Sequence, residues 1–160
     1  MKYATKEAGI TLIEVVIGIS IIAVAAVAIG YSINAYVSAR AALLSDLKAA
    51  YLAEEGYELI RSIRDDDWMT LDALSLGALH YLDVSSTTAT VTGTPEVIDG
   101  EYTRSFELNA LYRNASDDVT TSGAPGATVD DGGRTLEVNV YGPNGTTTFE
   151  AIITNIHAAS

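Results

Sequence analysis

A single carboxylate, that of Glu14, lies where a short basic segment gives way to a long apolar one. Residues 15–39 contain no charged side chain, and about 20 apolar residues are enough for a helix to cross a membrane. An acidic side chain costs about 2.5 to 3.5 kcal/mol at the centre of a membrane helix and less near its ends. Glu14 therefore marks either a functional site or an acid that the membrane edge tolerates.

The other reactive side chains form no catalytic pattern. The chain has no Cys, which excludes disulfides, Cys-ligated metals and a cysteine nucleophile. His80 and His157 are isolated, and the sequence has neither a Gly-flanked serine elbow nor an HExxH helix. We therefore expect a protein that is not an enzyme and that has no cofactor.

Three acidic clusters offer oxygen ligands of the kind that calcium prefers, at Asp65–Asp67, Asp117–Asp118 and Asp130–Asp131. None has the spaced acidic loop of a calcium-binding motif, so we interpret them as solvated turns and expect no metal site. The nine tyrosines and Trp68 could form an adhesive face, although such side chains more often belong to a core or an ordinary surface.

The apolar segment predicts a single-pass membrane anchor. A cleaved secretory signal has an apolar region of only about 7 to 15 residues, and this one is longer. Lys2 and Lys6 precede it, and basic residues favour the cytoplasmic side, so we expect a cytoplasmic N-terminus and an exported remainder. The expected spanning helix covers residues 10–34 and includes Val15, Ile17, Ile21, Val24 and Ile29.

Charge and length limit what the exported part does. The 160 residues carry a formal net charge of −12, and no lysine follows Lys48. Such a surface repels phosphate backbones, so we expect no direct binding of nucleic acid. About 120 residues follow the apolar segment, which is enough for one modest domain.

A helical pattern continues over residues 35–64. We expect this amphipathic segment to extend the apolar helix without a break, from about Ile10 to Arg64, and to tolerate Gly56. It should end near Arg64, because the acids of residues 65–67 would face the negative end of the helix dipole. The predicted apolar stripe consists of Val37, Leu44, Leu47, Tyr51, Leu52, Leu59, Ile60 and Ile63.

The remainder predicts an antiparallel sheet. Residues 65–101 read as a partly helical connector, in which Thr90–Thr92 has some strand propensity. Apolar and polar residues alternate over 102–112, with Ala110 on the apolar face, and again over 135–141; residues 114–133 are expected to be loose. Pro143-Asn144-Gly145 then signals a turn into a return strand. The fold class is thus α+β: a long N-terminal helix whose apolar stripe covers a small sheet within residues 102–160.

The segment from Gly9 to Ile29, with its Gly9-Ile10-Thr11-Leu12-Ile13-Glu14 start, resembles the N-terminal cleavage and methylation segment of type IV pilins and of type II secretion pseudopilins. The resemblance implies a leader of residues 1–9, cleavage between Gly9 and Ile10 by a prepilin peptidase, and N-methylation of Ile10 by the same enzyme. It also implies a pilin-like fold and a first helix that enters a filament core.

The resemblance gives Glu14 a role in assembly. In this family the corresponding glutamate meets the amino terminus of a neighbouring subunit, which here is the amine of Ile10. Each charge is costly alone in an apolar core, so the pair favours the assembled register. The implied partners are the peptidase, other pilin subunits, the inner membrane assembly machinery and, before assembly, membrane lipid. The implied location is the cytoplasmic membrane and then a periplasmic or extracellular filament.

Departures from the family pattern leave its finer divisions open. The mature chain would begin with Ile10 where many major pilins have Phe, and no proline occurs before Pro95. The segment from Leu52 to Asp65, with Trp68 after it, resembles minor-pilin-like proteins. Major and minor subunits, a type II secretion pseudopilin and an anchored binding domain that does not polymerise all stay open. The role of a filament in motility, adhesion, DNA uptake or secretion stays open too.

Overall fold

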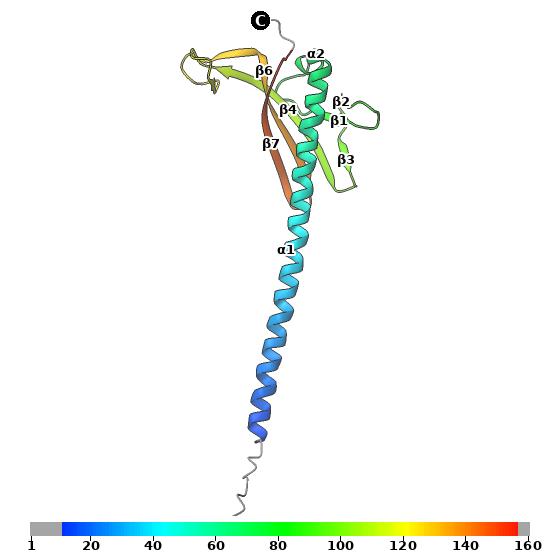
Figure 1. Ribbon diagram of the computed structural model, residues 1–160, viewed down its shortest axis with the longest axis vertical. Helices are drawn as coiled ribbons and strands as arrows, with labels where there is room; N and C mark the ends of the chain where they lie inside the picture. The colour runs from blue at the N-terminus through cyan, green and yellow to red at the C-terminus, as the bar shows by residue number, and fades with distance from the viewer. Residues whose placement is uncertain (1–10, 157–160) are drawn as a thin grey trace, which may run out of the picture. The chain divides into compact units, whose positions relative to one another are not determined.

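The computed structural model describes residues 11–156 (Figure 1). The chain divides into two compact units, Met1–Ala42 and Leu43–Ser160. Helix α1 belongs to both. The elements in chain order are α1 (Leu12–Asp66), α2 (Trp68–Asp72), β1 (Tyr81–Asp83), β2 (Thr90–Thr92), β3 (Glu96–Ile98), β4 (Tyr102–Arg113), β5 (Val119–Thr120), β6 (Thr128–Gly142) and β7 (Gly145–Thr154).

The described part of the first unit is the N-terminal portion of α1, and none of its side chains is buried. Three of its polar side chains bond to the helix itself: Ser20 Oγ donates to the Val16 carbonyl at 2.7 Å, and Ser32 Oγ to that of Ala28 at 2.9 Å. Asn34 Nδ2 donates to the carbonyl of Gly30 at 3.1 Å. Because these groups find partners within the helix, they add little to the cost of an apolar environment.

The second unit contains an antiparallel sheet in the order β3-β4-β6-β7, with β5 paired to the far end of β4. Strands β1 and β2 form a separate two-stranded sheet. Strands β6 and β7 make the predicted hairpin, in which Gly142 pairs with Gly145 around the turn. Residues 43–66 of α1 pack on one face of the larger sheet (Figure 1), which confirms the α+β, pilin-like fold class.

The helix face that covers the sheet differs from the predicted stripe. Ile60 and Ile63 are buried as expected, but Leu44, Leu47 and Tyr51 are 56%, 46% and 70% exposed. The helix instead buries small residues, because they let its backbone approach the strands closely. The buried helix positions are Ala49, Ala53, Gly56, Ile60 and Ile63, and they face a sheet core that includes Phe106, Leu108, Leu136, Val138 and Val140.

Gly56 is the point of closest approach. A Cβ added there would lie 2.9 Å from Cδ of Arg104 and 3.0 Å from Cγ1 of Val138, and both of these side chains are buried. The sequence pattern treats Gly56 as a tolerated interruption of the helix. The structure shows that it is a packing requirement.

Gly56→Ala is therefore expected to destabilise the second unit although Ala is the better helix former. Overpacking costs about 1 to 3 kcal/mol, and the propensity gain is about 1 kcal/mol, so we expect a net loss of about 1 kcal/mol. Thermal unfolding of the full chain in a non-ionic detergent would measure it. Gly30→Ala is the matched control, because an added Cβ there meets nothing within 4 Å. A rise in melting temperature for Gly56→Ala would contradict the close packing.

Helix α1 ends two residues later than predicted, at Asp66. The guanidinium of Arg64 lies 2.6 Å from the carboxylate of Asp65, which offsets that acid's unfavourable place at the helix end. Asp67 caps α2 instead, accepting from the backbone N–H of Met69 at 3.0 Å.

The connector and the segment expected to be loose contain more strand than predicted. The helical part is α2, and Thr90–Thr92 forms β2 as expected, but β1 and β3 were not predicted. Strand β6 begins at Thr128, inside the segment 114–133 that was expected to be loose. Its pairing with β4 slips between Ala110 and Leu111, so Leu111 is buried where the alternation predicts Ala110.

Candidate functional site

Glu14 lies in the first turn of α1, and its side chain is exposed. The carbonyl of Thr11 accepts hydrogen bonds from the backbone N–H groups of Glu14 at 3.1 Å and Val15 at 3.3 Å, so Thr11 occupies the position that caps the helix. A negative charge in the first turn interacts favourably with the helix dipole. Thr11 and Glu14 also have the spacing of a capping box. The helix start is thus a local reason for an acid here.

Within residues 11–156, no Lys, Arg or His side chain lies within ion-pair distance of Glu14. Gly9 and Ile10, the predicted cleavage and methylation positions, lie outside the described residues, as does the leader 1–9. A counter-charge for Glu14 would have to come from outside the described part of the chain.

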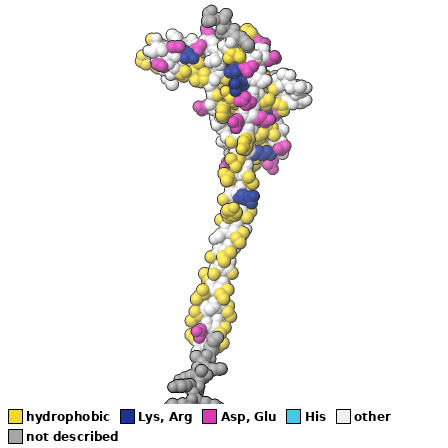
Figure 2. Space-filling view, viewed as in Figure 1, with side chains coloured by type: hydrophobic (Ala, Val, Ile, Leu, Met, Phe, Trp, Pro, Cys, Tyr) yellow, Lys and Arg dark blue, Asp and Glu magenta, His cyan; other side chains and the backbone are white. Residues whose placement is uncertain are grey.

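The surroundings of Glu14 are apolar and uncovered. Figure 2 shows hydrophobic side chains along the visible face of the N-terminal part of α1, while acidic and basic side chains gather over the second unit. The helix is long and apolar enough to cross a membrane. Apolar side chains around a helix require lipid or other helices as neighbours. The predicted spanning residues are exposed by 44% to 71%: Val15, Ile17, Ile21, Val24 and Ile29.

Residues 4–30 match the prokaryotic N-terminal methylation motif. The chain carries the signal region of type IV pilins and pseudopilins. This motif, together with the apolar helix, supports a membrane-anchored, pilin-like substrate of a prepilin peptidase. No curated protein and no solved structure matches the chain.

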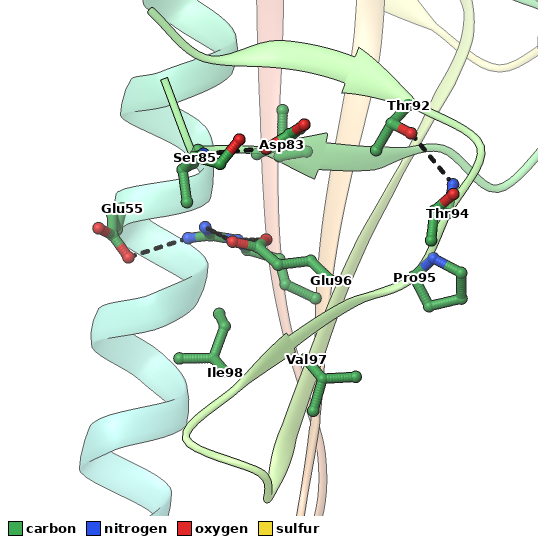
Figure 3. A pocket seen from close by; sticks show the side chains of 12 residues that line it. Glu55, Asp83, Ser85, Thr92, Thr94, Pro95, Glu96, Val97 and Ile98 are labelled. Carbon is green, nitrogen blue, oxygen red and sulfur yellow. Dashed lines mark hydrogen bonds and ion pairs between the residues drawn. The ribbon is translucent and has the colours of Figure 1, made fainter. Parts of the chain in front are cut away.

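The pilin-like chain has a buried charge cluster in its second unit that the sequence analysis missed. The side chain of Arg104, on β4, is 2% exposed. It donates from Nε and Nη2 to the two carboxylate oxygens of Glu96 at 2.8 and 2.9 Å, and from Nη1 to the Glu55 carboxylate and the Leu52 carbonyl, both at 3.0 Å. Figure 3 shows Glu55, from α1, and Glu96, from β3, converging on this guanidinium group.

The cluster serves structure more than ligand binding. Hydrogen bonds occupy four of the five N–H donors of the guanidinium, so it has little left to offer a ligand. The cluster borders an open hollow of about 640 Å³. Asp83 on the hollow's rim accepts hydrogen bonds from the hydroxyl and backbone N–H of Ser85, which hold the pKa of that carboxyl below its usual value. Arg104 fixes both α1 and β3 to β4.

The remaining candidate residues of the pilin-like chain do not converge. His80 Nε2 lies 3.0 Å from the carbonyl of Ser75, and its ring is 5.5 Å from that of Phe106; His157 lies outside the described residues. Over residues 11–156, no group of three or more His or acidic side chains could hold a metal ion.

Asp130 belongs to one of the acidic clusters and forms an ion pair with Arg113 on the neighbouring strand β4. Its carboxylate lies 2.6 Å from Nε of Arg113, and this hydrogen bond is the main cause that lowers the pKa of Asp130.

Trp68 is buried and lies under the guanidinium of Arg134, whose Cζ is 5.9 Å from the centroid of the Trp68 ring. These side chains stabilise the second unit, so we place the candidate site of the pilin-like chain at its N-terminal helix.

Proposed function

We propose that this chain is a structural, non-enzymatic subunit of a type IV pilus or a pilus-like filament. A prepilin peptidase removes residues 1–9 and methylates Ile10. The N-terminus lies in the cytoplasm before assembly, and the second unit lies outside the membrane. Assembly proceeds through α1, with Glu14 paired to the Ile10 amine of a neighbouring subunit.

The observation that carries this proposal is the methylation motif over residues 4–30, followed in the chain by the N-terminal apolar part of α1, none of whose residues between 12 and 42 is buried. Such a helix is stable in lipid before assembly and among other helices after it. The absence of an ion-pair partner for Glu14 among residues 11–156 agrees with a partner contributed by another subunit. A buried acid without one would cost several kcal/mol.

Processing is tested by intact-mass measurement of the chain purified from membranes that contain a prepilin peptidase. We expect a protein that begins at Ile10 and carries one added methyl group. Gly9→Val should abolish cleavage, because the residue before the scissile bond is changed, while the control Gly30→Val should be processed as wild type. A wild-type chain that keeps residues 1–9 and stays monomeric would support an anchored binding domain instead.

A further inference from the structure

No strand within residues 11–156 pairs with the outer edge of β7. Strand β7 is the last in the sheet order and is ten residues long. Its backbone pairs with β6, and no other backbone hydrogen bond of residues 145–154 is found in the described chain. Proteins protect such edges with Pro, Lys, bulges or short strands. Residues 145–154 contain no Pro and no Lys, and their pairing with β6 has no register shift.

A row of three glutamates ends at this edge. Glu107 of β4 lies opposite Glu137 of β6, and Glu137 lies opposite Glu150 of β7. Successive side chains of a strand point to opposite faces of the sheet. Phe106 and Val138, which precede Glu107 and follow Glu137, are buried in the core beneath α1, so the glutamates lie on the face that is turned away from α1. Directly opposed side chains have Cβ atoms about 5 Å apart, so like charges there repel each other. None of the three forms an ion pair with a residue of the range 11–156.

Other features of the same face point to a missing neighbour. Glu137 and Glu150 line a hollow of about 600 Å³ together with Ile152, which is 45% exposed. Ser105 precedes Glu107 by two residues and therefore shares its face of β4. Its hydroxyl is buried and has no hydrogen-bond partner. Ser105 lies two strands in from the edge of β7, so a neighbour at that edge would not reach its hydroxyl. The edge itself combines carboxylates that have no ion-pair partner within residues 11–156 and an uncovered apolar side chain.

We propose that the edge of β7 binds an extended basic segment of another protein as an additional strand. Backbone groups of the segment would continue the ladder, and a Lys or Arg opposite Glu150 would become the fourth member of the row and relieve its repulsion. The aliphatic stem of a second Lys or Arg two positions away, on the same face, would cover Ile152. This inference concerns the second unit and is independent of whether the chain forms filaments.

Charge argues for a different protein rather than a second copy. In a symmetric dimer, two β7 strands would pair antiparallel. When most of their residues are matched, the two Glu150 side chains, near the middle of each strand, lie opposite or diagonal to each other. The row would then gain further carboxylates instead of a cation, which disfavours the pair.

The test uses the full chain in a non-ionic detergent and a fluorescent ten-residue peptide of alternating Thr and Lys. We expect saturable binding by anisotropy, and protection of the outward amides of β7 from hydrogen exchange. A peptide that is N-methylated at two adjacent central residues keeps the charge but cannot complete the ladder, because one of the two blocked amides faces β7 in either register, so it should bind at least about tenfold more weakly. Equal binding of the two peptides would overturn the proposal, as would no binding at all or a chain that dimerises through β7.

Two double variants distinguish the contribution of the glutamate row to peptide binding from that of the overall negative charge. Glu137→Gln with Glu150→Gln should weaken binding about tenfold or more, since it removes the cation's partners. Asn139 Nδ2 donates a hydrogen bond to the side-chain oxygen of Glu137 at 2.8 Å, and a Gln side chain can still accept it. Because the variant also removes the repulsion between the carboxylates, its unfolding midpoint should stay the same or rise. Asp117→Asn with Asp118→Asn removes the same charge elsewhere and should change binding less than about twofold. An equal loss in both double variants would overturn the proposal.

Discussion

Replacing Glu14 with Gln is expected to keep the chain out of filaments while it is still inserted in the membrane and cleaved. The amine of Ile10 in the neighbouring subunit would lose its counter-charge, and an uncompensated charge in an apolar contact costs about 3 to 5 kcal/mol. Since 1.4 kcal/mol is a factor of ten, incorporation should fall at least about 100-fold. Immunoblots of sheared filaments against membrane fractions would measure it.

The choice of Gln distinguishes charge pairing from a role at the helix start. Thr11 and Glu14 have capping-box spacing, and Gln serves that box as well as Glu does. If Glu14 only supports the first turn of α1, then Glu14→Gln assembles like wild type and only Glu14→Ala fails. If it pairs with an amine, both variants fail. Glu54→Gln, at an exposed position farther along α1, is the control for the loss of one carboxylate and should assemble normally.

The N-terminal helix was predictable because its determinants are contiguous in the chain. Apolar character from Val15 onward, the place of Glu14 before it and the lack of proline each act within a few helical turns, and local sequence reports them directly. The hairpin of β6 and β7 was predictable for the same reason, since a turn signal at Pro143-Asn144-Gly145 separates two alternating segments.

The errors arise where pairing across the chain decides the outcome. Strands β1 and β3 have three residues each, too few to show a period, and β3 exists because it pairs with β4. The slip between Ala110 and Leu111 depends on extra residues in β6, so the alternation within β4 could not indicate it. Leu44 is exposed because the face of α1 that is turned to the sheet carries Ala49, Ala53 and Gly56, which only the contact with the sheet reveals.

Arg104 escaped notice because its partners are 8 and 49 residues away in the chain. The alternating pattern of β4 places it on the apolar face, where an arginine is unexpected. The available signal was the combination of that position with a glycine in the covering helix, since Gly56 makes room for the side chain. Sequence alone does not say which acids neutralise it.

Arg104→Met is expected to destabilise the second unit by about 3 to 5 kcal/mol. The methionine fills much of the space of the arginine stem, but the carboxylate of Glu96, whose side chain is 10% exposed, loses both of its charged hydrogen bonds. The Glu55 side chain is 57% exposed and stays hydrated, so it contributes little to the cost. Chemical denaturation of the full chain in detergent would measure the change, which is a large share of the 5 to about 15 kcal/mol typical of a domain.

The double variant Arg104→Met with Glu96→Gln identifies the cause. Because no buried charge is left unpaired, it should recover more than half of the loss, and hydrogen exchange in β3 should return toward the wild-type rate. Arg104→Lys should fall between wild type and Arg104→Met, since one ammonium cannot reach Glu96 with two parallel hydrogen bonds and also bond to Leu52 on α1. If Arg104→Met costs less than about 1 kcal/mol, or if the double variant is no more stable than the single one, the cluster does not fix α1 and β3 to the sheet. The recovery matters more than the loss, because any large core substitution can destabilise, whereas only a charge left without its partner is rescued by neutralising Glu96.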